Sequence, residues 1–247
     1  MSAANPVSIH EQRRLIRQLL DDSSPDDAPT AYYALFSDPT RATLFIETTD
    51  SGQAAGFVGR FQTGIDLFRP LVTLRCQDAG IAAGLLDEAL TPGRPYLLFA
   101  KLNQLALVGG SLHINNERIL LIYQLDPARF HPEINVLVTH NTAHDGTPRC
   151  KISSGEAEAV AGVNWQSPAF AEIYVHTDPS ARHRGWGGNV AAAITQTVLD
   201  SGRIPIYLVE NHNEPSRRLA EHLGFVDTGA RQVFADATYQ GHPGRQG

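Results

Sequence analysis

The chain has 247 residues, of which 42% are hydrophobic and 19% are charged, as is typical of a soluble globular protein with a sizeable buried core. Its formal net charge of -6 argues against a general nucleic-acid binder, because phosphate backbones require a clustered basic surface. The two cysteines, Cys76 and Cys150, form no CxxC motif, so we expect free thiols and a reducing, cytoplasmic setting. We expect neither a secretory signal nor a membrane span, since no apolar stretch approaches about 20 residues.

The first 125 residues predict a half built from short helices and a run of strands. After a loose terminus, residues 11–20 have the spacing of an amphipathic helix, with Arg13, Arg14 and Arg17 on its solvated face. A loop at 21–29 and a short helix at 31–37 follow. The remaining expected elements are strands at 42–49, 54–61 and 71–76, a hairpin turn at 50–52, a helix at 80–90, and strands at 96–100 and 118–125.

A change of composition at 126–132, which includes two prolines, predicts a boundary between two parts of the chain. We therefore expect one domain at 1–125, a second at 126–240 and a flexible tail at 241–247. In the second domain, strands are expected at 136–139, 151–153 and 157–165, with a polar loop between the first two. The composition from Ala235 onward predicts a frayed end.

The segment from 170 to 225 has the most informative order of elements in the chain. It reads as a strand at 170–175, a glycine-rich turn at 182–188, a helix at 189–201, a second strand at 204–209 and a helix from Asn213 to Gly224.

The turn contains three glycines, Gly185, Gly187 and Gly188, directly before the helix. Free backbone N–H groups and the helix dipole favour an anion at such a helix start, and residues without Cβ let the backbone approach it closely. Arg182 and Arg184 add positive charge. The turn is neither a Walker A loop, because no Gly-Lys-Ser/Thr follows, nor a dinucleotide fingerprint, because Val190 replaces its third glycine.

The last helix has its own start and stop signals. Asn213 suits the N-cap, Pro215 suits the first turn, and Gly224 suits the position just past the end. The Arg-x-x-Gly-x-Gly turn and this helix, ending in Leu-Gly-Phe225, together resemble the two diagnostic motifs of the GNAT superfamily of acyl-CoA N-acyltransferases. The resemblance covers about 157–234.

The first half matches the same order of elements only in outline. Gln77-Asp78-Ala79-Gly80 stands where the phosphate-binding turn would be, and Asp78 would repel a pyrophosphate. We expect this half to be either a degenerate repeat of the second half or the variable N-terminal half of the superfamily.

The resemblance implies an α/β fold with a mixed, mainly antiparallel sheet flanked by helices. It also implies acetyl-CoA as co-substrate and no metal. The pantetheine arm would lie between two splayed strands at 173–176 and 206–209, and a backbone N–H near 174–176 would face the thioester oxygen. The implied cofactor-binding residues are Tyr174, Val175, His176, Arg182, His183, Arg184, Gly185, Trp186, Gly187, Gly188, Asn213 and Ser216.

Glu172 matches the position of a catalytic glutamate in part of the superfamily, so we expect it to be the general base, with Glu210 as the rival. The leaving thiolate needs a proton or a stabilising charge. Many members use a tyrosine seven residues after the asparagine, but here that position is Ala220. Ser216 is the second catalytic candidate, and His212 and His222 are substitutes.

We therefore expect an N-acetyltransferase that transfers acetyl from acetyl-CoA to a primary amine by direct attack. A catalytically inactive acyl-CoA sensor or scaffold, favoured by Ala220, is the alternative, and an enzyme for longer acyl chains is a second. The acceptor is expected to be a small-molecule or peptide amine, with no nucleic-acid or membrane partner, and a homodimer stays open. His140 and His144 have a spacing that could bind zinc on a helix, but their segment reads as a loop, so no metal site is expected.

Overall fold

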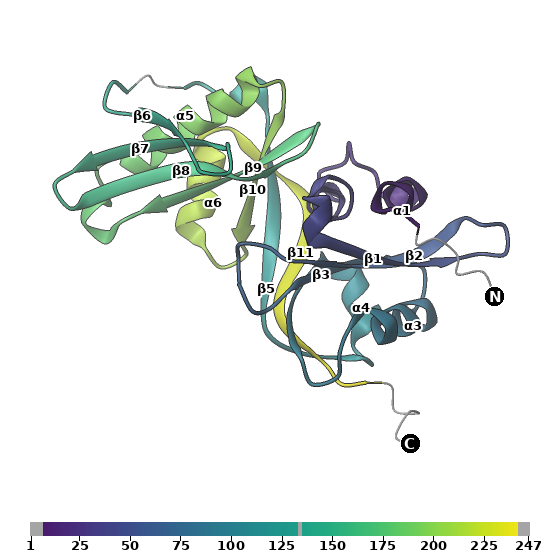
Figure 1. Cartoon of the computed structure of the whole chain (residues 1–247). Helices are drawn as coiled ribbons and strands as arrows, with labels where there is room; N and C mark the ends of the chain where they lie inside the picture. Colours follow the sequence, from purple (N-terminus) through teal and green to yellow (C-terminus); the bar gives the residue numbers. More distant parts are fainter. Residues whose placement is uncertain (1–6, 133–134, 242–247) are drawn as a thin grey trace. The chain divides into compact units, whose positions relative to one another are not determined.

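The computed structural model describes residues 7–132 and 135–241 (Figure 1). The predicted loose terminus and tail lie almost entirely outside these residues. The chain forms two compact units. The first unit contains the chain up to Ile119 and the segment from Arg231 onward, and the second contains Leu120–Ala230. No helix within the described ranges is both long and apolar enough to cross a membrane.

The sheet of the first unit is mainly antiparallel. Its strands are β1 (Ala42–Thr48), β2 (Ala54–Phe61), β3 (Leu71–Cys76), β4 (Pro95–Lys101) and the second part of β11 (Phe225–Tyr239), in this spatial order. β3 and β4 are parallel, and each other neighbouring pair is antiparallel. The predicted strands and the hairpin between β1 and β2 are confirmed.

Helices of the first unit are α1 (Ile9–Ile16), α2 (Ala28–Ala31), α3 (Ala79–Ala89) and α4 (Leu105–Val108). α1 begins with a capping box between Ser8 and Glu11, and it buries Ile16. The prediction of a fully solvated arginine face on this helix is wrong for Arg13. Its guanidinium donates to the carbonyl oxygen of Ser37 at 2.6 Å and to that of Ala34 at 3.2 Å, because both carbonyls lie at the end of a helical segment where backbone acceptors are left over.

The sheet of the second unit has one parallel pair among antiparallel neighbours. In spatial order its strands are the second part of β5 (Leu112–Leu125), β10 (Ile204–Glu210), β9 (Phe170–Thr177), β8 (Ala157–Gln166), β7 (Pro148–Ser154) and β6 (Thr139–Thr142). β9 and β10 are parallel, and the other pairs are antiparallel. The fold class expected from the resemblance is thus confirmed.

Two predictions about the second half are wrong. The strand expected at 136–139 starts only at Thr139, and Val136 and Leu137 are 91% and 60% exposed, so their hydrophobicity does not reflect burial in a sheet. The frayed end expected from Ala235 is instead part of β11 as far as Tyr239. There Ala235, Ala237 and Tyr239 alternate inward with at most 3% exposure, and this period of two is what a half-buried strand requires.

Two helices cover the core of the second unit. α5 (Trp186–Asp200) buries Val190, Ala191, Ile194 and Val198 against β7, β8 and β9. α6 (Glu214–His222) adds Ala220 to the same core. The expected start and end of α6 are confirmed, because the Asn213 side chain accepts from the Ser216 N–H at 3.2 Å and Gly224 has φ of +91°. A Cβ at Gly224 would lie 2.7 Å from the carbonyl oxygen of Arg129, so only glycine fits there.

The two units share an order of elements. In each, antiparallel strands lead to a strand whose parallel neighbour follows after one helix, α3 in the first unit and α5 in the second. Each unit is completed by a strand from the other half of the sequence. β5, which follows the first-unit elements, pairs with β10, and β11, which follows the second-unit elements, pairs with β4.

Candidate active site

The start of α5 offers backbone N–H groups to an anion. A 3-10 turn at Pro179–Ala181 leads to Gly185, which is the N-cap of α5 with φ of +74° and makes no side-chain cap hydrogen bond. His183, with φ of +60°, is also left-handed, so the chain reverses tightly on either side of Arg184. Without a capping side chain, the N–H groups of the first helical turn remain available, and the helix dipole favours negative charge beside them.

The glycines also let this helix start lie close to the end of β9. A Cβ on Gly187 would stand 2.8 Å from Oγ1 of Thr177, a distance that real side chains do not tolerate. At Gly185 a Cβ would meet open space, so its requirement for glycine comes from the positive φ alone. Gly187 therefore sets the approach of helix and strand, and Gly185 sets the turn.

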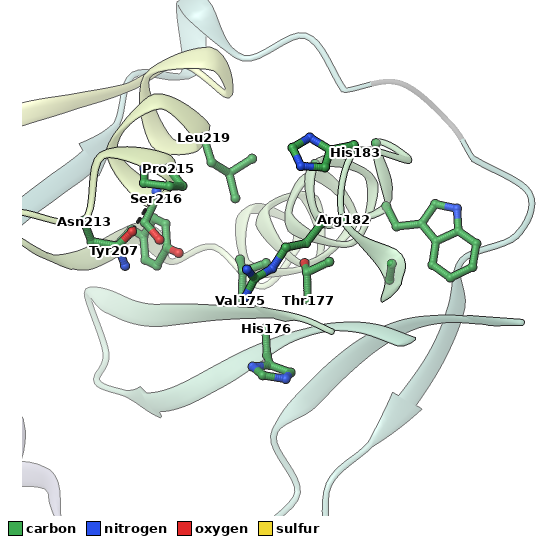
Figure 2. Close-up of a pocket in the computed structure, with 15 residues that line it drawn as sticks. Val175, His176, Thr177, Arg182, His183, Tyr207, Asn213, Pro215, Ser216 and Leu219 are labelled. Carbon is green, nitrogen blue, oxygen red and sulfur yellow. Dashed lines mark hydrogen bonds between the residues drawn. The ribbon is translucent and has the colours of Figure 1, made fainter. Parts of the chain in front are cut away.

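A cavity of about 690 Å³ opens in front of this helix start. Figure 2 shows β9 side chains on one side and α6 side chains on the other, with Tyr207 of β10 between them. Its lining residues are Val175, His176, Thr177, Ala181, Arg182, His183, Gly185, Trp186, Gly187, Gly188, Tyr207, Asn213, Pro215, Ser216 and Leu219. All of them belong to the second unit.

The cavity lies where the two parallel strands separate. Pairing between β9 and β10 runs from Phe170 opposite Ile204 to Ile173 opposite Tyr207. Beyond this point β9 remains paired with β8 as far as Thr177, while β10 remains paired with β5 as far as Glu210. The backbone of β9 from Tyr174 onward therefore has a free edge toward β10, which is the kind of edge that an extended ligand can pair with.

Positive and titratable side chains gather at the turn end of the cavity. Arg182 and His183 line it, and Nε2 of His176 lies 3.2 Å from Oδ1 of Asp178. Arg184 does not line the cavity, because its guanidinium stacks over the Trp186 ring at 5.2 Å from the centroid. The predicted positive charge near the helix start thus comes from Arg182, while Arg184 contacts the indole.

Most of the predicted binding residues come together in this cavity. Ten of the twelve line it: Val175, His176, Arg182, His183, Gly185, Trp186, Gly187, Gly188, Asn213 and Ser216. Arg184 and Tyr174 do not line it. The Tyr174 ring crowds Gly162 of β8, where an added Cβ would stand 2.8 Å from the phenol oxygen, so this tyrosine is directed away along the sheet.

Glu172, the expected base, is not among the residues that line the cavity. It lies one residue before the last paired position of β9, beside the apex of the strand opening. Burial raises the pKa of its carboxyl to about 7. Hydrogen bonds from Asn164 and Trp165 lower this pKa, but their effect is smaller than that of burial. The Asn164 amide donates to Oε1 at 3.0 Å. Asn164 is the extra residue of a bulge, since Val163 pairs with Ile173 and Trp165 with Glu172, and this bulge brings the amide to the carboxyl.

Glu210, the rival base, lies at the far end of β10, and its Oε2 lies 3.2 Å from Nε2 of His212. Neither residue lines the cavity, and the same holds for His222 near the end of α6. Cys150 is buried, which raises its pKa to about 11, and its Sγ lies 3.5 Å from Nδ1 of His140. Within the described ranges, no group of three or more His, Cys, Asp or Glu side chains could hold a metal ion.

Sequence reasoning missed Tyr207. Its side chain lines the cavity at the apex. Burial raises its pKa, hydrogen bonding with Ser216 acts in the lowering direction, and the charge of Glu172 acts in the raising direction. In the sequence it lies within an apolar strand, where an aromatic residue is expected to belong to the hydrophobic core. The signal that could have found it is the alanine at 220, which leaves the segment without the expected helical tyrosine and makes any other tyrosine in it a candidate.

In the corresponding part of the first unit, side chains take up the backbone N–H groups that a ligand would use. β3 and β4 pair only at Leu71 and Val72, so they too separate, but the side chain of Gln104 accepts the backbone N–H of Cys76 at 2.9 Å. Asp78 caps α3 by accepting from the Ile81 N–H at 2.9 Å, which places a carboxylate at the helix start. A carboxylate there excludes a second anion, as the sequence predicted for Asp78.

Residues 152–234 match the model of a family described as FR47-like protein, a GNAT-type domain. No curated protein matches the sequence significantly. Among solved structures, a GCN5-related N-acetyltransferase from Sphaerobacter thermophilus has a TM-score of 0.59 at 12% identity, covering 97% of this chain and 96% of that one.

A tandem GNAT protein from the clavulanic acid biosynthesis pathway also has a TM-score of 0.59, at 13% identity over 94% of each chain. A GCN5-related N-acetyltransferase from Kribbella flavida has a TM-score of 0.54 at 16% identity, covering 76% of this chain and 88% of that one. At these identities the likeness shows the fold. The resemblance to the GNAT superfamily, strongest in the C-terminal half, is confirmed.

Proposed function

We propose that this GNAT-type chain is an N-acetyltransferase that transfers an acetyl group from acetyl-CoA to a primary amine. The observation that supports this best is the cavity at the uncapped, glycine-rich start of α5, which continues into the opening between β9 and β10. One end suits a diphosphate and the other suits an extended arm that pairs with a strand. Acyl-CoA combines both chemistries in one molecule.

The residues present fit such a substrate. The diphosphate would accept from the N–H groups of the first turn of α5, with Arg182 as counter-charge. The pantetheine arm would pair with the free backbone edge of β9 from Tyr174 onward, and one N–H of this edge would stabilise the negative charge that develops on the thioester oxygen. Val175 and Leu219 give the wall of the cavity its apolar part.

Glu172 is the proposed general base. An ammonium has no lone pair, so a proton must leave the amine before or during its attack on the thioester carbon. A carboxyl with a pKa of about 7 is well matched to that task near neutral pH, because about half of it is deprotonated at pH 7 and its conjugate base is strong enough to take a proton, directly or through one water. Its place beside the apex puts it on the strand along which the thioester would lie.

Direct transfer without an acyl-enzyme intermediate follows from the nature of the thiols. Cys76 and Cys150 are buried, and burial raises their pKa values to about 12 and about 11, so neither carries the thiolate that a nucleophile needs. Neither lines the cavity. The amine itself is then the nucleophile.

The test has two arms. Calorimetry with CoA measures binding, and a panel of primary amines, amino acids and peptides with acetyl-CoA measures transfer through release of free thiol. We expect binding in the micromolar range or tighter and thiol release that depends on one class of amine. Lack of CoA affinity would contradict the proposal outright.

Binding without transfer to any amine would favour the alternative of an inactive acyl-CoA sensor, for which the alanine at 220 is the supporting observation. Competition between acetyl-CoA and longer thioesters decides whether acetyl is the preferred acyl group.

A further inference from the structure

We propose that Tyr207 of β10 is the acid that protonates the departing thiolate of CoA. This inference rests on the proposed function. It assigns a catalytic role to a strand residue that touches the substrate cavity.

Tyr207 occupies the point at which the strands part. It is the last residue of β10 that pairs with β9, opposite Ile173, and it is only 6% exposed. In Figure 2 its ring lies between β9 and the start of α6, beside Ser216. A pantetheine arm lying in the opening would bring its sulfur to this apex, because the paired strands beyond it leave no further room.

Few other groups in the cavity could supply a proton there. Among the described residues that line it, those with titratable side chains are His176, Arg182, His183 and Tyr207. Arg182 and His183 belong to the turn before α5, at the diphosphate end. The His176 side chain is 70% exposed and directed to Asp178. Tyr207 alone among these four is buried at the apex.

Ser216 orients the phenol. It lines the cavity beside Tyr207, and its own N–H is held by the Asn213 side chain at 3.2 Å, so the cap of α6 fixes the backbone from which Ser216 faces the phenol. Ala220 lies one helical turn further on the same face of α6 and is fully buried. Its methyl group offers no proton. Ser216 is therefore a positioning residue for Tyr207, which revises its expected role as a catalytic group.

The step balances in protons and electrons. The substrate ammonium gives one proton to Glu172, its nitrogen then forms a bond to the thioester carbon, and the nitrogen of this adduct releases a second proton to solvent. The carbon–sulfur bond then breaks, sulfur keeps the electron pair, and the Tyr207 hydroxyl gives its proton to sulfur. Proton transfer from Glu172 to the phenolate through solvent restores the resting state, and the products are the amide and CoA thiol.

The protonation state of the phenol suits this step. Burial raises the pKa of Tyr207 above its ordinary value, although hydrogen bonding with Ser216 acts in the lowering direction, and the charge of Glu172 adds to the rise, so the hydroxyl stays protonated at neutral pH. An ordinary thiol has a pKa of about 8.5, but a thiolate formed in the same buried place becomes a stronger base for the same reason.

The decisive experiment compares Tyr207→Phe with Tyr123→Phe in the full chain. Tyr123 is a buried tyrosine on β5, directly opposite Tyr207 in the sheet, and its hydroxyl donates to Oε1 of Glu221 at 3.1 Å instead of lining the cavity. We expect Tyr207→Phe to lower kcat by about 100-fold, a typical loss for an acid–base group, while the Kd for CoA changes less than threefold. Tyr123→Phe should leave kcat within twofold.

A leaving-group series separates an acid from a structural residue. A selenolate is a weaker base than a thiolate and leaves without a proton donor, so the acetyl selenoester of CoA should restore Tyr207→Phe to within about fivefold of the unmodified protein. Equal losses with the thioester and the selenoester would overturn the proposal. An unchanged kcat with the thioester would do the same.

If Tyr207→Phe does not fold, the pH dependence of kcat of the unmodified protein with the two donors tests the proposal instead. Its kcat with the thioester should fall at high pH, where the phenol ionises, and should stay level with the selenoester. A profile that is the same for both donors contradicts the assignment. Absence of any transfer by the unmodified protein would instead refute the proposed function, and the role of Tyr207 with it.

Discussion

Replacing Glu172 by Gln is the sharpest test of the proposed chemistry, because the amide keeps the shape of the side chain and removes its basicity. With a pKa of about 7, roughly a tenth of the carboxyl is deprotonated at pH 6 and roughly nine tenths at pH 8. We therefore expect kcat/KM of the unmodified protein to rise about tenfold over this range. Glu172→Gln should lose about 100-fold to 1,000-fold in kcat and show no such rise, with CoA affinity unchanged.

The same substitution has a predictable effect on stability. The folded state raises the pKa of Glu172 from 4.5 to about 7, so the folded chain binds a proton that the unfolded chain releases in this window. The free energy of unfolding therefore falls as pH rises from 4.5 to 7. A shift of this size corresponds to on the order of 1–3 kcal/mol, after allowance for solvent screening of a half-buried side chain.

Glu172→Gln lacks this titration, so its stability relative to the unmodified chain should increase by that amount between pH 4.5 and pH 8. Denaturant melts at several pH values measure it. Glu158→Gln is the matched control, since Glu158 lies on β8 in the same sheet and pairs with Lys151 away from the cavity. A flat pH–rate profile between pH 6 and 8, or a Glu172→Gln variant with more than half of the activity, would refute the reasoning.

Three further outcomes are expected. Gly185→Ala should weaken CoA binding about tenfold in calorimetry, because an alanine at φ of +74° costs about 1–2 kcal/mol and shifts the turn. Gly155→Ala is the control: it lies at φ of +59° in the β7–β8 turn, and it should carry the same strain without loss of CoA affinity. Calorimetry should give one CoA per chain, since Gln104 and Asp78 close the corresponding site of the first unit, and a stoichiometry of two would contradict this. Cys76 and Cys150 should resist a thiol reagent in the native protein and react on unfolding, because burial raises the pKa values of both thiols. Rapid labelling of either thiol in the folded chain would disprove this prediction.

Local patterns sufficed for much of the candidate site. The glycine-rich turn, the strand before it and the capped helix after it are contiguous in sequence, and their chemistry depends on backbone geometry that residue types control directly. Gly185 needs a left-handed conformation, and Asn213 caps α6 through its own side chain. Such features could be predicted because each involves residues only a few positions apart.

Side-chain direction was harder to predict. Arg184 was expected at the substrate, but its guanidinium stacks on the indole of Trp186, which does line the cavity, and the positive charge there comes from Arg182. The raised pKa of Glu172 depends on burial, and the bulge in β8 brings the Asn164 amide to its carboxyl. The role proposed for Tyr207 depends on its place beside Ser216 of another element. Nothing in the neighbouring sequence specifies these surroundings.

The sequence by itself determined the turn, the two helices of the second unit and the two strands around them, because helix periodicity, capping and glycine conformations are local properties. Only the tertiary structure decided which strand completes each sheet. The sequence predicts a frayed end from Ala235 onward, yet these residues belong to the part of β11 that pairs with β4. In the same way, β5 pairs with β10, which is distant in sequence. Any exposed strand edge presents the same backbone groups, so the choice of partner depends on burial of side chains from distant segments, which local sequence does not encode.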